Sequence, residues 1–311
     1  MTRVRQFKGF VVATVILLIV GHSTLANPPS NSDMPAMSLN EILDKVTAAY
    51  KSTETYKSDG TITSDIDTGG LKISIVTSFS ILLKKPDLYL ISWTQKNMPM
   101  AGMDRSGAVW SDGTQPFLFM GVVNAYSKMS SDEIALGGAT GISGGAAFTI
   151  PSLFLSVFKE QPKLLSRLTN PKVEVGEKVG EEECYVISGS SSISKKETFW
   201  VSKKSYLIKK YYRSLESPEG GVTIPEMTDE QLDEAIKGMG QKVTDETRQK
   251  MKDMMKKSSD VLKTAKLKGS STEIHANVSS PDVSAKDFQF TPPKDSVLKD
   301  SLFGNVLQGD K

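Results

Sequence analysis

Apolar residues recur along the chain with two different periods, and the change of period predicts where helix gives way to sheet. In residues 38–52 the apolar positions follow helical spacing, and Ser38 with Glu41 forms a capping box at the start. From residue 56 the period becomes two, and segments rich in Ile, Val, Thr and aromatic residues alternate with short turns. The pattern predicts an N-terminal helix followed by a long antiparallel meander.

The meander is interrupted before it ends. Residues 137–145 hold five glycines in nine positions, which predicts a loop, and residues 152–168 are apolar enough for a buried helix that Pro162 divides. Residues 228–268 return to helical spacing and are predicted to form a helical insert. Together the segments predict an α+β fold, with about eleven strands in one highly curved antiparallel sheet that helices cover.

The last predicted strand lies in AKDFQFTPPKDS, residues 285–296. Phe288 and Phe290 alternate with polar residues, so the pattern places both rings on one face, pointing inward. Pro292 and Pro293 lack backbone N–H groups and are expected to prevent any further strand from pairing after this edge. The domain is therefore expected to end near residue 296, and residues 297–311 to form a C-terminal tail.

The first 26 residues have the composition of a secretory signal peptide. Basic residues precede an apolar run of 12 residues, and Thr24 and Ala26 occupy the −3 and −1 positions of a cleavage site. The alternative is an uncleaved N-terminal membrane anchor, although a spanning helix needs ~20 apolar residues. A linker rich in Pro, Ser and Asn follows at residues 27–37. Cleavage near Ala26 predicts an exported, periplasmic protein whose domain begins at residue 38.

Composition argues against several classes of function. Three of the 38 basic residues and none of the 36 acidic ones lie in residues 1–26, so the mature chain has a net charge of −1, without a basic excess for nucleic acid. The mature chain keeps one histidine, His275, and one cysteine, Cys184, and no neighbouring spacing supports a zinc site or a triad. No catalytic residue, metal or cofactor is expected, and the protein is not expected to be an enzyme.

A set of features in fixed order resembles the LolA-like periplasmic proteins, and within that superfamily the DUF2092 type. The features are the capped N-terminal helix, the turn and strand KKPDLYLISW, the turn SDG before an aromatic strand, and the terminal FQFTPPKD. The resemblance implies an unclosed β-barrel whose hydrophobic concave face is covered by helices that act as a lid. In carriers of this superfamily the concave face holds lipoprotein acyl chains, and each CH₂ group removed from water is worth about 0.8 kcal/mol.

The resemblance also implies candidate site residues. Lys85 stands before the proline of the second turn, where the carriers have an arginine that bonds the lid, so it is the candidate latch. The glycine-rich segment itself predicts a hinge for the lid, at Gly137, Gly138, Gly144 and Gly145, with a plain mobile loop as the alternative. The residues expected to line the cavity or its lid are Phe79, Ile81, Tyr89, Ile91, Trp93, Leu153, Phe154, Phe158, Phe288 and Phe290.

Two hypotheses of function follow. The first is a carrier or chaperone that binds a lipid, or the acyl chains of a lipoprotein, in the concave face. The second is a sensory or regulatory module that binds a membrane-protein partner without ferrying cargo, because a pure carrier does not need the insert at residues 228–268. The second half of this insert carries many lysines beside its methionines, so contact with an anionic membrane surface is a further expectation.

Overall fold

The computed structural model describes residues 37–67, 72–96, 105–158, 165–216, 227–238, 241–264 and 268–302. The expected signal peptide and nearly all of the expected linker lie outside these residues. Helix α1 (Leu39–Ser52) begins at the expected capping box, in which the Ser38 N–H donates to the Glu41 carboxylate at 2.7 Å and the Glu41 N–H donates to Ser38 Oγ at 3.3 Å.

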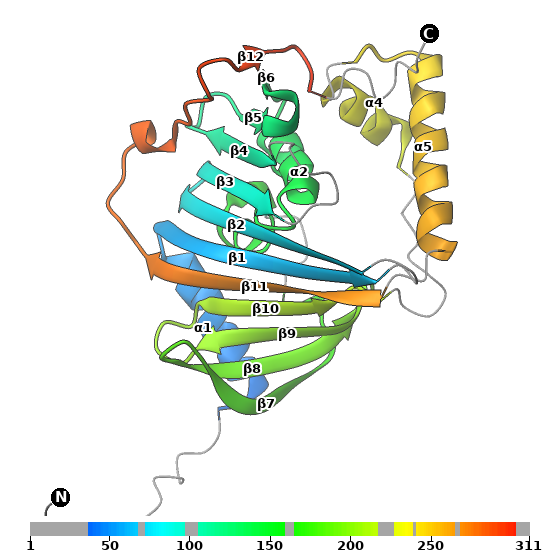
Figure 1. Ribbon diagram of the computed structural model, residues 1–311. Helices are drawn as coiled ribbons and strands as arrows, with labels where there is room; N and C mark the ends of the chain where they lie inside the picture. The colour runs from blue at the N-terminus through cyan, green and yellow to red at the C-terminus, as the bar shows by residue number, and fades with distance from the viewer. Residues whose placement is uncertain are drawn as a thin grey trace, which may run out of the picture. The chain divides into compact units, whose positions relative to one another are not determined.

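The described strands form one twelve-stranded sheet, in which every neighbouring pair is antiparallel except β12 with β6 (Figure 1). The strand order is β12-β6-β5-β4-β3-β2-β1-β11-β10-β9-β8-β7, and the two end strands do not pair with each other, so the barrel is open. This confirms the expected fold class. The strands are β1 (Thr55–Asp67), β2 (Lys72–Lys84), β3 (Leu88–Lys96), β4 (Ser106–Ser111), β5 (Phe117–Met120), β6 (Ala125–Lys128), β7 (Thr169–Val179), β8 (Glu182–Ser191), β9 (Ser194–Ser202), β10 (Ile208–Ser214), β11 (Lys268–Ser279) and β12 (Val297–Leu298).

The concave face of the sheet carries the main hydrophobic core. Alternate residues of the central strands point to this face, as in the row Ile81, Ile91 and Val109 on β2, β3 and β4. Figure 1 shows α1 crossing behind the strands, and its buried residues are Ile42, Val46 and Tyr50. Full burial of one such side chain is worth about 1.5–3 kcal/mol, so packing of this face stabilises both the sheet and its helices.

The glycine-rich segment is only partly the expected loop. Gly137 and Gly138 lie inside helix α2 (Asp132–Ile142), so the loop prediction was wrong for these two residues. The helix forms despite its glycines because Ser131 caps it and one side packs on the core, through Ala135, Leu136 and Ala139. Gly144 and Gly145 lie in the turn that follows, at φ values of 70° and 113° that favour glycine.

A 3-10 turn, η1 (Gly121–Val123), connects β5 to β6.

The helix expected at residues 152–168, divided at Pro162, is also wrong where the structure describes this segment. Helix α3 (Pro151–Phe154) is one turn long, Leu155 is extended, and a 3-10 turn, η2 (Ser156–Phe158), follows. The cause is a distant contact, because the Asp87 carboxylate in the β2–β3 turn accepts hydrogen bonds from the Ser156 hydroxyl and, at 2.8 Å, from the Val157 N–H. Residues 159–164, with the expected break at Pro162, lie outside the described residues.

Helices α4 (Asp229–Gly238) and α5 (Asp245–Thr264) lie between β10 and β11 in the chain. They share a small apolar cluster of their own, and Arg248 of α5 donates to both oxygens of Asp233 of α4 at 2.6 and 2.8 Å. Such a bidentate pair fixes orientation as well as adding energy. The buried members of the cluster are Leu232, Ile236 and Met251.

The predicted C-terminal strand is a 3-10 turn, η3 (Ala285–Phe288). Ser284 and Asp287 form a capping box, in which the Ser284 N–H donates to the Asp287 carboxylate at 2.7 Å, and this local bond competes with an extended strand. Phe288 is fully buried, whereas Phe290 packs on aromatic residues in a cluster separate from the main core. The two rings therefore do not share one inward face, which corrects the prediction.

A further strand does follow the two prolines, against the prediction. Strand β12 pairs in parallel with β6, and the Val297 N–H donates to the Asn124 carbonyl at 3.1 Å. Pro292 and Pro293 remove backbone donors only at their own positions, so the chain pairs again once it has passed them.

Candidate ligand-binding cavity

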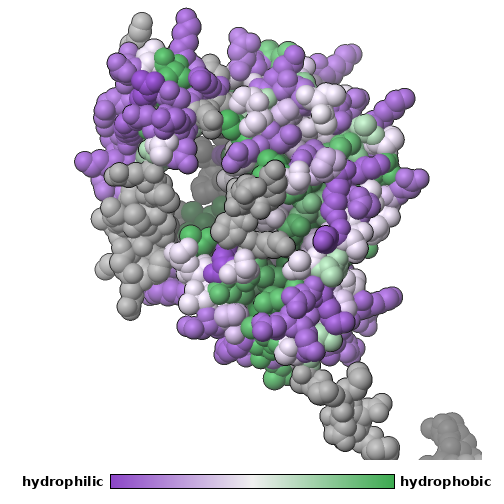
Figure 2. Space-filling model, turned by 180° about the vertical axis from the view of Figure 1, so that it is seen from behind, coloured by the Kyte–Doolittle hydropathy of each residue, from purple (hydrophilic) through white to green (hydrophobic). Residues whose placement is uncertain are grey.

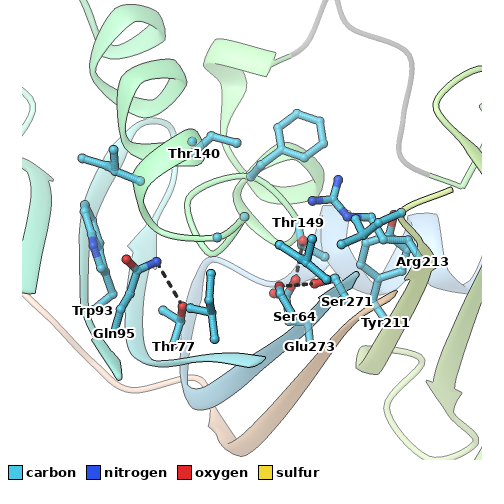
Figure 3. Close-up of a pocket in the computed structure, with 18 of the residues that line it drawn as sticks. Ser64, Thr77, Trp93, Gln95, Thr140, Thr149, Tyr211, Arg213, Ser271 and Glu273 are labelled. Carbon is cyan, nitrogen blue, oxygen red and sulfur yellow. Dashed lines mark hydrogen bonds between the residues drawn. The ribbon is translucent and has the colours of Figure 1, made fainter. Parts of the chain in front are cut away.

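A cavity of about 760 Å³ lies against the concave face, which is a volume typical of small-ligand pockets. Figure 3 shows residues from the strands on one side of it, with Thr140 and Thr149 from α2 and the turns after it on the other. From the back, Figure 2 shows hydrophobic atoms exposed between hydrophilic ones. Residues in the wall include Ser64, Ile75, Thr77, Trp93, Gln95, Thr140, Phe148, Thr149, Arg167, Tyr211, Arg213, Ser271 and Glu273.

The strand register brings distant residues together in the cavity wall. Residues directly opposite each other in neighbouring strands point to the same face of a sheet. One row across β9, β10, β11, β1 and β2 consists of Glu197, Arg213, Ser271, Ser64 and Ile75. The next row on the same face consists of Phe199, Tyr211, Glu273, Ile62 and Thr77. The β9–β11 side therefore contributes charged side chains, and the β2–β3 side contributes Ile75 and Trp93.

Glu197 is completely buried beside the cavity, and its carboxylate is fully engaged. Its Oε2 accepts hydrogen bonds from Arg167 at 2.9 Å and from the Tyr211 hydroxyl at 2.6 Å, and its Oε1 accepts one from Ser191. Burial and, after it, the neighbouring Glu197 charge raise the pKa of the Tyr211 hydroxyl, which therefore stays a neutral donor. Removing one partner would leave the buried Glu197 charge poorly compensated, which is strongly destabilising. The cluster therefore holds the side chains of Arg167 and Tyr211 in place in the cavity wall.

A second buried group contains His275. Its Nδ1 lies 3.2 Å from Ser58 Oγ and its Nε2 lies 3.0 Å from Glu273 Oε1, while the Thr149 hydroxyl donates to Glu273 Oε2 at 2.6 Å. The order of serine, histidine and carboxylate is that of a nucleophilic triad. However, Ser58 is completely buried and does not line the cavity. The group instead ties β1 to β11 and to the segment before α3.

Two glycines allow aromatic rings to form the inner surface. A methyl group at Gly107 of β4 would lie 2.3 Å from the ring of Trp93, its partner in β3. A methyl group at Gly60 would lie 2.2 Å from the ring of Phe79. Each ring therefore lies across the neighbouring strand, and that of Trp93 becomes part of the cavity wall.

Lys85 lies at a second cavity, of about 510 Å³. Its Nζ donates to the carbonyl oxygens of Tyr50 at 3.0 Å and of Lys51 at 2.5 Å, near the C-terminal end of α1. A helix leaves its last carbonyl groups unpaired, and a positive charge there is favourable. Lys85 therefore fastens α1 to the β2–β3 turn.

The expected lining residues lie in different places. Trp93, Gly144 and Gly145 line the larger cavity, and Leu153 and Phe154 line the second one together with Lys85. Gly137 and Gly138 do not line either cavity. The remaining expected residues of the main core are buried and line neither cavity: Phe79, Ile81, Tyr89, Ile91 and Phe158.

Sequence reasoning missed the polar residues of the cavity, among them Arg167, Tyr211, Arg213 and Glu273. The available signal was the alternation within IKKYYRS, residues 208–214, where Tyr211 and Arg213 share one face of the strand. A charged residue on an inward-facing position is unusual enough to mark a site. Arg167 carries no such signal, because it lies outside the strands.

Two features are absent from the residues that the structure describes. No helix among them is both long and apolar enough to cross a membrane. Nor do three His, Cys, Asp or Glu side chains come together there as metal ligands.

An open antiparallel sheet with a cavity on its helix-covered concave face defines a half-barrel protein. The chain matches the family described as "Predicted periplasmic protein (DUF2092)" over residues 40–224. Because the match covers more than half of the chain, the protein belongs to the DUF2092 family, which confirms the resemblance expected from the sequence. No curated protein matches the chain.

Several solved structures match the chain at low identity and low TM-score. LprF from Mycobacterium bovis is 7% identical with a TM-score of 0.40, and the match covers 82% of this chain and 96% of that one. A conserved protein from Thermus thermophilus is 7% identical with a TM-score of 0.38, covering 84% and 97%. The LolA superfamily protein NE2245 from Nitrosomonas europaea is 12% identical with a TM-score of 0.30, covering 82% and 99%. These low values assign no ligand or partner to this chain.

Proposed function

We propose that this protein is exported, with signal peptide cleavage near Ala26, and binds a hydrophobic ligand in the larger cavity as a periplasmic carrier or chaperone. The observation that carries the proposal is a cavity of about 760 Å³ on a face that is otherwise packed with buried apolar residues. Its wall includes Ile75, Trp93 and Phe148. An acyl chain gains about 0.8 kcal/mol for each CH₂ group that it buries, so binding needs no reacting group. The family description supports the compartment.

The parts proposed to open the concave face are α1 and the turn after α2. Lys85 is the latch, because it fastens the C-terminal end of α1 through two carbonyl groups. Gly144 and Gly145 are the hinge, because they lie in the cavity wall and have positive φ values, which glycine adopts readily. Hinges of this kind absorb large changes of φ and ψ at a few residues.

Titration with N-phenylnaphthylamine, an uncharged fluorescent probe, tests the proposal. We expect saturable binding to the mature protein, and at least tenfold weaker binding to Ile75→Glu, which places a charge in the apolar wall. Ser74→Glu is the matched control, because Ser74 is exposed on the opposite face of β2 and should leave the affinity unchanged. Equal affinity of the two variants would contradict binding in this cavity.

The alternative is an interaction module for a membrane-protein partner, and the α4–α5 hairpin favours it. The hairpin has its own apolar cluster, while Arg248, Lys250 and Lys252 of α5 all pair with carboxylates of the same hairpin. These internal pairs reduce the charge available for a membrane surface. Absence of saturable probe binding to the wild-type protein would favour this alternative over the carrier.

A further inference from the structure

We infer that the ligand is an amphiphile with one anionic head group, a carboxylate or phosphate, which Arg213 binds. The inference rests on the proposed function and specifies its ligand class. It starts from the unequal distribution of charge around the cavity, in which Arg213 and the apolar residue Ile75 lie in the same row, three strands apart.

Arg213 is a cavity residue without a partner of its own. It is half-buried in β10, and its side chain has no hydrogen bond or ion pair with any residue that the structure describes. Figure 3 shows Arg213 beside Tyr211 on one side of the cavity, with Trp93 and Gln95 on the other. A guanidinium group that is partly removed from water and unpaired is a ready site for an anion, because its planar N–H groups match carboxylate and phosphate oxygens.

Two carboxylates, Glu197 and Glu273, lie beside Arg213 on the same face of the sheet, and each has another partner. Glu197, directly opposite in β9, accepts its hydrogen bonds from Arg167, Tyr211 and Ser191. Glu273 accepts a hydrogen bond from Thr149 and lies 3.0 Å from the His275 ring. Neither carboxylate forms an ion pair with Arg213, so its charge is left for a ligand.

The charges of the wall also favour an anion. The described lining residues include three arginines, Arg105, Arg167 and Arg213, and one carboxylate, Glu273. Arg105 has an interaction of its own, and Arg167 is balanced by Glu197. Even when Glu197 is counted, arginines outnumber carboxylates among these described residues, which favours an anionic ligand over a cationic one.

The positions of the apolar residues indicate how the rest of the ligand lies in the cavity. Ser271 is opposite Arg213 in β11, and its hydroxyl lies 3.2 Å from that of Ser64 in β1, so donors continue beside the guanidinium. Beyond them the wall contains Ile75 and Trp93. A head group at Arg213 therefore places an attached hydrocarbon chain along the apolar side of the cavity, and the two ends of the ligand are recognised by different strands.

The experiment compares dodecanoate with dodecan-1-ol, which share a chain length and differ in charge, by displacement of N-phenylnaphthylamine from the mature protein. We expect dodecanoate to bind at least tenfold more tightly than the alcohol. Arg213→Leu should remove that difference by weakening dodecanoate alone, and Arg213→Lys should retain part of it. Lys210→Gln is the matched control, because Lys210 is the β10 residue whose ammonium lies 4.0 Å from the Trp200 ring, outside the cavity.

The possible results separate the inference from the proposed function. Equal binding of acid and alcohol to the wild-type protein overturns the anionic head group and leaves the apolar cavity intact. A preference for the acid that survives in Arg213→Leu overturns the role of Arg213. Displacement of the probe by acetate alone at matched concentration overturns the amphiphile, because the site would then take a free ion. Failure of both long-chain ligands and of the probe to bind overturns the proposed function itself.

Discussion

Gly107 and Gly60 lack side chains at positions where the rings of Trp93 and Phe79 occupy the space. In a sheet, glycine normally weakens a strand, because it has high conformational entropy in the unfolded chain and no side chain to pack. Here the burial of the Trp93 and Phe79 rings against the neighbouring strands offsets that cost. Gly107 allows the Trp93 ring to form part of the cavity wall, so the cavity depends on a position that contributes no side chain of its own.

We predict that Gly107→Ala lowers the free energy of unfolding by about 1–3 kcal/mol, as overpacking of a core typically does. The added methyl group would lie 2.3 Å from the Trp93 ring, which cannot move without disturbing the cavity wall. Gly137→Ala is the matched control, since a methyl group there meets nothing within 4 Å and lies in α2, where alanine is worth about 0.5–1 kcal/mol more than glycine. Urea denaturation measures the free energy of unfolding of both variants. Equal stability of Gly107→Ala and the wild-type protein would contradict the packing described.

At the scale of elements, the sequence predicts best what is determined locally. Helix α1 follows from its capping box and apolar spacing, and the strands follow from alternation. The segment after α3 could not be predicted in this way, because its bonds to Asp87 are distant in the sequence. The turn at η3 does have a local signal, the pair of Ser284 and Asp287, but the alternation of Phe288 and Phe290 favoured a strand there. The site divides in the same manner. Of its apolar wall the sequence predicted Trp93 but not Ile75 or Phe148, and the meeting of Arg213 with Glu197 and Ser271 requires the strand register.

We predict that Lys85→Met speeds hydrogen–deuterium exchange near the C-terminal end of α1. The substitution removes two hydrogen bonds from a charged group to α1 carbonyls, and a loss of about 1.5 kcal/mol corresponds to roughly tenfold faster exchange. Lys84→Met is the matched control, because Lys84 donates to the Val283 carbonyl at 2.6 Å and not to α1. Unchanged exchange in α1 of Lys85→Met would argue against the latch, and equal acceleration in both variants would show a general loss of stability instead.

At the scale of the whole molecule, the open sheet, its covering helices and the cavity form one functional arrangement. A sheet of this length cannot bury its concave face by itself, so α1, α2 and α3 supply apolar side chains to it. The helices do not fill the space beside the charged residues Arg213 of β10 and Glu273 of β11, and the cavity lies there. We therefore propose that this space is a binding site for an apolar or amphiphilic molecule from the envelope.

Native mass spectrometry of the mature protein, purified from the exporting cell without any detergent, tests that claim most directly. We predict a population heavier than the polypeptide by the mass of one lipid-like molecule, which denaturation releases and solvent extraction recovers. Ile75→Glu should lose this population, and Ser74→Glu should keep it. If the wild-type protein shows only the mass of the polypeptide, both as purified and after incubation with an envelope lipid extract, the cavity is not a ligand-binding site and the account is contradicted.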